Sequence, residues 1–343
     1  MGRKVSFIIP AYNVQSSLRQ CLDSFVYGQD VPYRDYEVLI VDDGSFDNTA
    51  AIAQKYVQSC PEIFRYLRKA NGGHGSVINA GVPLAEGKYV KIIDADDWIE
   101  PDSLAPYLDA LASNDADVIV TNFRTYDQAT GRVKAWKTRS ASVEVIGMEE
   151  LTQRWYDFAS CLTFHGLTYL KNFYLQNGIR LSEGVFYEDA EYSTVPLCRA
   201  ESICILNQYL YCYRTGVADQ SVSEANRIER LADLEIVLRR LCAYAKSEWN
   251  LMTVPMRLCC LKRITAVAQS YFVTPLLRFP DREVGRKRAA SFYAFLTAAA
   301  PDVAAAAVKR YHLLRLLNHV GFRYSVLNRW SDSSLFEWFK QLL

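Results

Sequence analysis

The sequence lacks the features that mark several classes of protein. None of its nine cysteines forms a CxxC pair. An odd, scattered set of this kind is typical of reduced, buried thiols in a cytosolic protein, not of a disulfide framework or a zinc site. No run of about 18 residues is apolar and free of charge, so no transmembrane helix is expected. Only a short apolar stretch, ended by Pro10, follows the basic start of the chain, which is not the pattern of a signal peptide.

An excess of charge of one sign is missing as well. The 343 residues include 39 basic and 38 acidic ones, so the net charge of +1 gives no general attraction to nucleic acid. Basic residues outnumber acidic ones locally, in 274–290 and from residue 308 onward. We therefore expect a cytoplasmic protein without a nucleic-acid partner, and we keep open a peripheral contact of its C-terminal third with the inner face of the membrane.

What the first 125 residues do contain is a regular alternation of apolar runs and amphipathic segments. Strands are predicted at 5–9, 36–41, 64–67, 89–93 and 117–123, and helices at 16–27, 47–56, 75–84 and 101–112. Strands that alternate with helices form a parallel sheet, and continuously apolar strands indicate helices on both of its faces. Ligands of such sheets bind outside the carboxyl ends of the strands.

The rest of the chain is predicted to be mixed and then helical. Strands are expected near 141–146 and 204–213, and helices near 148–158 and 187–198. From residue 227 the pattern is helical almost to the end, with breaks at prolines 255, 275, 280 and 301. The segment 308–330 mixes leucine and aromatic residues with basic ones. It either packs its apolar face on the protein or on a second copy, or lies on an anionic membrane.

Three carboxylates crowd the end of one predicted strand, where "IIDADD" places Asp94, Asp96 and Asp97. Carboxylates so close together repel one another. Asp94 and Asp96 can face a single Mg²⁺ or Mn²⁺ ion, whose remaining positions suit the oxygens of a diphosphate. The alternative is a solvated turn in which Asp96 or Asp97 begins the next helix.

Two other strand ends carry polar or aromatic residues. In "VDDGSFDNT", Asp42 and Asp43 follow a strand, and a carboxylate there can accept a hydrogen bond from an imide N–H such as that of uracil. The alternative is a corner between strand and helix, capped by Ser45 or Asp47. In "IIPAYN", the ring of Tyr12 can lie against a planar base, or it can pack on a neighbouring loop.

The stretch "NGGHGSVINAG" opens a predicted helix with three glycines. Such a loop can bring backbone N–H groups close to phosphate oxygens, although it is neither a GxGxxG nor a Walker motif. His74 can donate to a phosphate, or it is an exposed loop residue. Asn79 falls one turn into the helix and can face the ligand.

In this order and spacing, the four stretches resemble the GT-A fold of family 2 glycosyltransferases, an inverting group that uses nucleotide sugars. The resemblance covers the first 125 residues. It implies that the uracil and ribose are held by Pro10, Ala11, Tyr12 and Asp42, and that Asn13 and Asp43 also bind the donor. It also implies that Asn79, Asp94 and Asp96 face the sugar diphosphate, with Asp96 the principal metal ligand and Asp94 the second. The arginine usual in the glycine-rich stretch is absent, and His74 or the backbone is expected to substitute for it.

Two later stretches extend the resemblance. In "LSEGVFYEDAEY", Glu188-Asp189 is similar to the acidic pair of the family. An inverting transfer needs one base for the acceptor hydroxyl, and we assign Asp189 to that role with Glu188 in support. The alternative is a capped helix start in a negative patch. In "YLYCYRTG", Arg214 is expected to bind the departing diphosphate, and residues 216–223 to close over the donor as a lid.

The expectation from the sequence is therefore an α/β protein of GT-A type, with a mainly parallel sheet flanked by helices and a helical C-terminal extension. Residues 1–225 would form the nucleotide-sugar-binding and catalytic domain, and residues 226–343 the helical region, with self-association left open. The function would be transfer from a UDP-sugar to a hydroxyl of a glycan or lipid-linked acceptor, with Mg²⁺ or Mn²⁺, in the synthesis of surface polysaccharides or other glycans. The alternatives are a sugar nucleotidyltransferase, which the loop "PAYNVQSS" does not favour, and an inactive nucleotide-sugar-binding protein.

Overall fold

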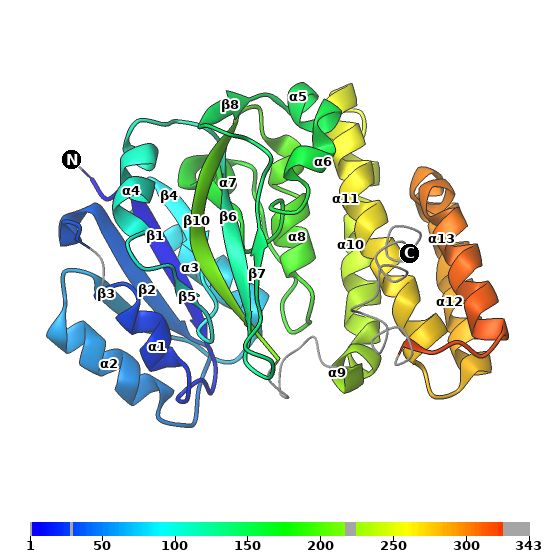
Figure 1. Ribbon diagram of the computed structural model, residues 1–343, viewed down its shortest axis with the longest axis horizontal. Helices are drawn as coiled ribbons and strands as arrows, with labels where there is room; N and C mark the ends of the chain where they lie inside the picture. Colours follow the sequence, from blue (N-terminus) through cyan, green and yellow to red (C-terminus); the bar gives the residue numbers. More distant parts are fainter. Residues whose placement is uncertain (1, 28–29, 217–223, 325–343) are drawn as a thin grey trace. The chain divides into compact units, whose positions relative to one another are not determined.

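A computed structural model describes residues 2–27, 30–216 and 224–324 of the chain (Figure 1). The chain divides into two compact units, Met1–Ala218 and Asp219–Leu343. This division rests on compactness alone, so the catalytic domain expected at 1–225 stays a prediction.

The first unit is built on a ten-stranded sheet in the order β3-β2-β1-β4-β9-β6-β10-β5, in which β7 pairs with β6 and β8 with β10. The strands are β1 (Val5–Ala11), β2 (Tyr36–Asp42), β3 (Phe64–Arg68), β4 (Tyr89–Ile92), β5 (Trp98–Ile99), β6 (Val118–Asp127), β7 (Val133–Trp136), β8 (Glu144–Ile146), β9 (Leu167–Leu170) and β10 (Ile203–Thr215).

Short helices connect and cover these strands. They are α1 (Leu18–Asp23), α2 (Thr49–Ser59), α3 (His74–Leu84), α4 (Leu104–Ala112), α5 (Met148–Gln153), α6 (Trp155–Phe158), α7 (Lys171–Gln176) and α8 (Asp189–Thr194), with single 3₁₀ turns at Tyr33–Asp35 and Leu197–Arg199. The alternation of strands and helices predicted for the first 125 residues is confirmed, and the fold class with it.

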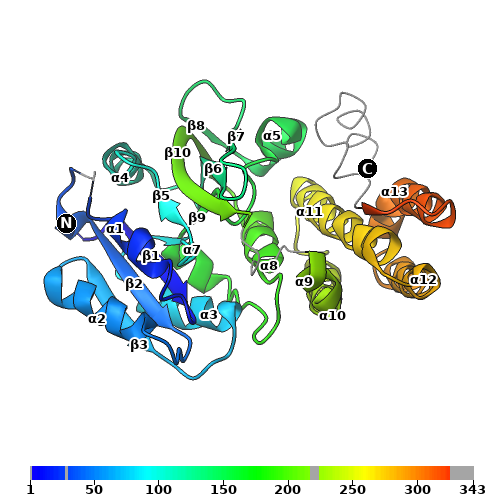
Figure 2. The same ribbon diagram turned by 60° about the horizontal axis from the view of Figure 1, so that its bottom comes forward.

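Parallel pairing brings the predicted site segments to one edge of the sheet. β1 pairs in parallel with both β2 and β4, so their carboxyl ends point the same way. Every residue of these three strands is buried, as their continuously apolar sequences predict. The loops that follow them, which begin near residues 12, 43 and 93, therefore lie at the same edge of the sheet. Figure 2 shows β1 and β2 next to each other.

The sequence did not predict β9 or β5, two of the strands that make this sheet mixed. β9 lies antiparallel between β4 and β6, and β5 is antiparallel to β10. These strands have four and two residues. A strand this short shows no period of its own, so its pairing depends on the neighbours that the rest of the chain brings to it.

Several helices differ from their predicted bounds. The helix expected at 47–56 begins at Thr49, with Asn48 in the capping position that we had assigned to Asp47. Asp47 still accepts a hydrogen bond from the Thr49 backbone N–H at 2.9 Å. The helix expected at 148–158 is interrupted at Arg154, and the one expected at 187–198 is reduced to α8 and a 3₁₀ turn.

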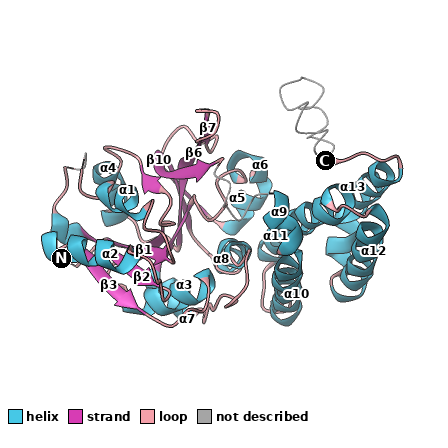
Figure 3. Cartoon of the chain, turned by 90° about the horizontal axis from the view of Figure 1, so that it is seen from below, coloured by secondary structure: helices cyan, strands magenta, loops and turns pink. Residues whose placement is uncertain are grey.

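The described part of the second unit is helical, as predicted (Figure 3). Its elements are α9 (Glu224–Glu229), α10 (Leu231–Glu248), α11 (Val254–Val273), a π-helical turn at Thr274–Arg278, α12 (Arg282–Ala299) and α13 (Pro301–His319). Pro255 and Pro301 lie in the first turns of α11 and α13, where proline leaves no intrahelical hydrogen bond unmade. Over the described residues, none of the helices combines the length and the apolarity needed to span a bilayer.

An aromatic core joins three helices of the second unit. Phe272 on α11 contacts Phe292 on α12 and Tyr311 on α13. Tyr293 and Tyr311 stack with their centroids 4.3 Å apart. Removing α13 would therefore uncover the faces of α11 and α12 together.

Truncation of the chain before Ser291 is expected to cause aggregation. The cut removes α13 and the buried side chains of Phe292, Leu296, Val303, Tyr311 and Leu314. The apolar partners left behind on α11 would face water, at a cost of roughly 2 kcal/mol for each large side chain. Size-exclusion chromatography of the truncated and full chains measures this. A truncated protein that stays soluble and active, and only detaches from anionic liposomes, would instead assign this region to membrane binding.

Candidate active site

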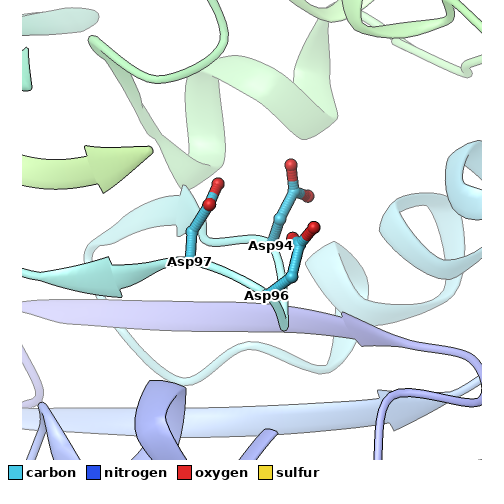
Figure 4. Close-up of side chains that lie close together, drawn as sticks. All are labelled: Asp94, Asp96 and Asp97. Atoms are coloured by element: carbon cyan, nitrogen blue, oxygen red, sulfur yellow. The ribbon is translucent and has the colours of Figure 1, made fainter. Parts of the chain in front are cut away.

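Three carboxylates form a compact cluster in the turn between β4 and β5. One oxygen from each of Asp94, Asp96 and Asp97 lies within 4.8 Å of the others. The three side chains project to the same side of the turn (Figure 4). Oxygen ligands at this spacing suit Mg²⁺ or Mn²⁺, so the donor set fits the metal predicted from the sequence.

The protonation of the cluster reflects its crowding. Burial and the neighbouring charge of Asp94 raise the pKa of Asp96 to about 6. Burial, together with Asp96 and Asp94, also raises the pKa of Asp97 well above its usual range. Crowding thus disfavours full ionisation of the three carboxylates, and a bound divalent cation would relieve the repulsion between them.

Asp97 is directed into the protein, whereas Asp94 and Asp96 reach solvent. Asp97 is fully buried and accepts hydrogen bonds from the Tyr211 hydroxyl at 2.6 Å and from the Arg214 backbone N–H at 2.7 Å. Asp94 and Asp96 are partly exposed. Asp97 therefore anchors the turn, which leaves Asp94 and Asp96 as the two carboxylates of the cluster that face outward.

Arg214 binds the backbone of the same turn. Its Nε donates to the carbonyl oxygen of Asp96 at 2.6 Å, and its guanidinium lies 5.2 Å from the ring centroid of Trp98. A cation is thereby fixed beside the carboxylates, where a diphosphate would arrive with the metal. The lid expected at 216–223 falls, beyond Gly216, outside the described residues.

His74 connects the acidic cluster to the predicted base. Its Nδ1 lies 2.6 Å from Oε1 of Glu188, and its Nε2 lies 2.9 Å from Oδ1 of Asp94. Both nitrogens can donate at once only in the imidazolium form. Burial acts to lower the pKa of His74, but the hydrogen bonds to Asp94 and Glu188 outweigh it and raise that pKa well above its usual value. A positive charge therefore links the two acidic groups.

The sequence did not identify this link. Two uses were expected for His74, as a phosphate donor or as an exposed loop residue, and in the structure its ring nitrogens face two protein carboxylates instead. The same contact acts on Asp94, since burial would raise the pKa of Asp94 but the hydrogen bond from His74 holds it below the usual value.

The glycine-rich loop is packed against the segment that precedes the acidic pair. A Cβ on Gly75 would lie 2.1 Å from the carbonyl oxygen of Ser182, so only glycine permits this approach. Gly184 also donates its backbone N–H to the carbonyl of Gly72 at 2.7 Å. The glycines thus bring the start of α3 to the start of α8, and phosphate binding by this loop stays a prediction.

Asn79 takes part in the same contact. Its side-chain amide donates to the carbonyl of Leu181 and to Glu183, both at 3.0 Å, and its Oδ1 accepts from the Leu181 N–H at 2.9 Å. It therefore holds the loop that leads to Glu188. Nothing in the structure tests the contact with a sugar diphosphate that the sequence suggests for Asn79.

Asp42 and Asp43 are directed into their own loops. Asp42 is fully buried and accepts hydrogen bonds from the Ser45 N–H at 2.7 Å and from the Tyr66 hydroxyl at 2.6 Å. Asp43 accepts from Lys69 at 2.7 Å and from the Gly73 N–H at 2.8 Å. The corner between strand and helix, which is one of the two interpretations of this stretch, is present. A contact of either aspartate with a base stays a prediction.

An open aromatic pair lies beside this corner. Tyr12 is 46% exposed and Phe46 is 83% exposed, and their rings meet edge to face with centroids 6.1 Å apart. Asn13, in the left-handed region at φ 53°, ties the two loops together because its Oδ1 accepts the Phe46 N–H at 3.0 Å. Pro10 and Ala11 are buried in β1 and shape this loop through the backbone. The sequence suggested Tyr12 as a contact for a base, but not Phe46.

The acidic pair begins α8 after a strained residue. Tyr187 has φ 71°, a conformation that is unfavourable for an aromatic residue and that recurs at functional sites. Glu188 is buried and faces His74, whereas the side chain of Asp189 reaches solvent. Desolvation by the surrounding protein and the charge of Glu188 raise the pKa of Asp189 to about 6. A carboxylate with this pKa is suited to accept a proton near neutral pH.

Comparison with known proteins agrees with this architecture. The family model described as "Glycosyl transferase family 2" matches residues 6–175. The chain is 30% identical to the uncharacterized glycosyltransferase MG060 homolog of Mycoplasma pneumoniae, a match over 68% of this chain and 76% of that protein. This chain belongs to glycosyltransferase family 2.

Other similarities extend the match. Glycosyltransferase GlyG of Streptococcus pneumoniae is 27% identical, over 62% of this family 2 chain and 71% of GlyG. Several further curated relatives are matched over less than two thirds of their length. The crystal structure of S. aureus TarS 1–349 aligns with a TM-score of 0.64 at 18% identity, over 94% of this chain and 92% of TarS. This likeness shows the fold, which is of GT-A type.

Replacement of His74 by leucine is expected to destabilise this family 2 enzyme. The change leaves Asp94 and Glu188 without their shared cation, and hydrogen bonds to charged groups contribute about 1.5–3 kcal/mol each. A fall of several degrees in the midpoint of thermal unfolding follows. Differential scanning calorimetry measures it, with His312→Leu at an exposed position of α13 as the control. An unchanged midpoint would show that the bridge contributes nothing to folding.

Proposed function

We propose that this protein is a metal-dependent, inverting glycosyltransferase that moves a sugar from a UDP-sugar to a hydroxyl acceptor. The observation that carries the proposal is the link through His74, which places a cluster of metal-type carboxylates next to a solvent-facing carboxylate with a pKa of about 6. The first group suits the donor diphosphate, and the second suits the acceptor.

Asp96 and Asp94 would hold the divalent cation, with Asp97 fixing the turn beneath them. When bound, such an ion supplies positive charge that neutralises the diphosphate and stabilises it as a leaving group. A mannosyltransferase from Pyrobaculum calidifontis, similar in fold with a TM-score of 0.56, was crystallised with GDP-Man and Mn²⁺. That complex supports a metal and a nucleotide sugar for the present site.

The donor is proposed to be a UDP-sugar. TarS, the structural neighbour with the same fold, was crystallised with UDP-GlcNAc and with UDP. In the present chain, the exposed rings of Tyr12 and Phe46 offer an aromatic surface to a base at the edge of the sheet. Asn13 and the Asp42–Asp43 corner would hold that surface in place.

Asp189 is proposed as the base of a single displacement. It would take the proton of the acceptor hydroxyl while that oxygen bonds to the anomeric carbon and the bond from that carbon to the diphosphate breaks. UDP leaves with the bonding electrons, beside Arg214. One base and no covalent enzyme intermediate are needed, which is why the configuration would invert.

The acceptor is proposed to be a growing glycan or a lipid-linked sugar. A relative that is 34% identical over 116 residues is a poly(ribitol-phosphate) beta-glucosyltransferase of Bacillus spizizenii. That name supports a role in the synthesis of surface polymers. Contact with a membrane surface and self-association through the second unit remain proposals alongside it.

A panel of UDP-sugars with Mn²⁺ tests the function. Ligands that bind the folded state raise its thermal stability, so the donor whose sugar the site prefers should raise the midpoint most. Release of UDP from that donor identifies a transferase, and production of pyrophosphate from UTP and a sugar phosphate identifies a nucleotidyltransferase. A shift without turnover, either by transfer or by hydrolysis of the donor, would identify an inactive binding protein.

Activity is expected to fall as the pH is lowered through about 6. Asp189 accepts a proton only as a carboxylate, and its pKa is about 6, so near pH 5 about one molecule in ten would keep a competent base. The dependence of kcat/KM on pH between 5 and 8 measures this. A rate that stays flat over this range would exclude Asp189 as the base.

A further inference from the structure

Four aromatic rings from four segments of the first unit form a continuous stack. Trp136 on β7 stacks on Phe123 of β6 with centroids 5.8 Å apart, and Phe123 stacks on His165, which precedes β9, at 5.0 Å. His165 in turn lies against Tyr213 of β10 at 4.3 Å. Each ring packs against the next, and this packing fixes the position of the last ring, that of Tyr213.

Tyr213 ends this stack beside the acidic cluster. On strand β10, Tyr211 and Tyr213 project from the same face, and the Tyr211 hydroxyl donates to Asp97 at 2.6 Å. Tyr213 lies two residues further toward the carboxyl end of the strand, next to Arg214. Its side chain is partly exposed, and no group of the described residues hydrogen-bonds to its hydroxyl.

The phenol of Tyr213 lies near both acidic groups of the site. Burial raises its pKa, and the negative charges of the cluster and of Asp189 raise it further. The phenol therefore remains protonated and can donate a hydrogen bond.

We propose that Tyr213 contacts the transferred sugar and contributes to the choice of sugar. The inference rests on the proposed function, in which the diphosphate lies at Asp94 and Asp96 and the acceptor hydroxyl at Asp189. In an inverting displacement the attacking and leaving oxygens lie on opposite faces of the anomeric carbon. The sugar therefore occupies the space between the cluster and the base, and Tyr213 borders that space with a free hydroxyl.

Tyr213→Phe tests this proposal because it keeps the ring and the stack while removing the hydroxyl. Affinity for UDP with Mn²⁺, measured by calorimetry, is expected to stay unchanged. Affinity for the UDP-sugar that the wild type binds best is expected to fall about tenfold, as for the loss of one hydrogen bond. The preference of the wild type for that sugar over its epimers is expected to fall as well.

Tyr209→Phe is the matched control, since Tyr209 lies on the same strand, contacts Arg124 through its ring and is outside the site. Equal affinities for the UDP-sugar in Tyr213→Phe and the wild type would overturn the proposal. A loss of affinity for UDP as large as that for the UDP-sugar would also overturn it, because the contact would then be with the nucleotide. A wild type that binds no UDP-sugar would overturn the proposed function itself, and this inference with it.

Discussion

Asp189→Asn is expected to lower turnover by about two to four orders of magnitude, the usual contribution of a positioned general base. Asparagine keeps nearly the same shape but cannot accept the proton of the acceptor hydroxyl. Binding of the donor should survive, because the proposed contacts with the metal come from Asp94 and Asp96, and the proposed contact with the uracil ring comes from Tyr12. Single-turnover rates, together with calorimetric affinity for UDP and Mn²⁺, separate these two effects.

Glu188→Gln is the natural comparison for this variant. Glu188 is buried and its carboxylate faces His74 at 2.6 Å, so its role would be to hold the histidine and not to meet the acceptor. The loss of turnover should therefore be smaller than for Asp189→Asn. Normal turnover of Asp189→Asn with an inactive Glu188→Gln would mean that the two roles are reversed. If both variants were active, the site would have no base and the inverting mechanism would lose its main support.

Asp96→Asn is expected to abolish metal-dependent donor binding while leaving the fold intact. Asp96 is partly exposed, and among neighbouring charges that of Asp94 has the largest effect on its pKa. Because that neighbour repels Asp96, the change removes the proposed metal ligand without breaking a salt bridge. An amide is also a weaker ligand for a hard cation than a carboxylate. The measurement is the affinity for UDP with and without Mn²⁺, next to the midpoint of thermal unfolding.

Asp115→Asn is the control for Asp96→Asn, because the Asp115 side chain is 94% exposed and its carboxylate forms an ion pair with Lys88. It should leave affinity for UDP with Mn²⁺ unchanged. If Asp96→Asn bound UDP with Mn²⁺ as tightly as the wild type, the metal assignment would be wrong. Greatly reduced stability of Asp96→Asn would show instead that the aspartate serves the fold.

Much of the frame of the site could be read from local sequence. Apolar runs located β1, β2 and β4, and the residues after each run marked the loops at the carboxyl edge. Parallel pairing of the backbones then places Tyr12, Asp43 and Asp94 at the same edge of the sheet, independently of the contacts that their side chains make. The antiparallel β9 was missed because it has four residues and is defined by its neighbours.

The sequence by itself determined the class of fold, the order of the loops and the acidic character of the site, because strand and helix periodicities and strand-end residues are local properties. Only the tertiary structure decided which groups meet. His74 is 20 residues from Asp94 and 114 residues from Glu188, and their hydrogen bonds exist because Gly75 lets α3 approach the segment before α8. The buried partners of Asp42 and the ring stack behind Tyr213 were fixed in the same way. A polar or aromatic side chain takes whichever partner packing brings within a few ångströms, and separation along the chain does not reveal that partner.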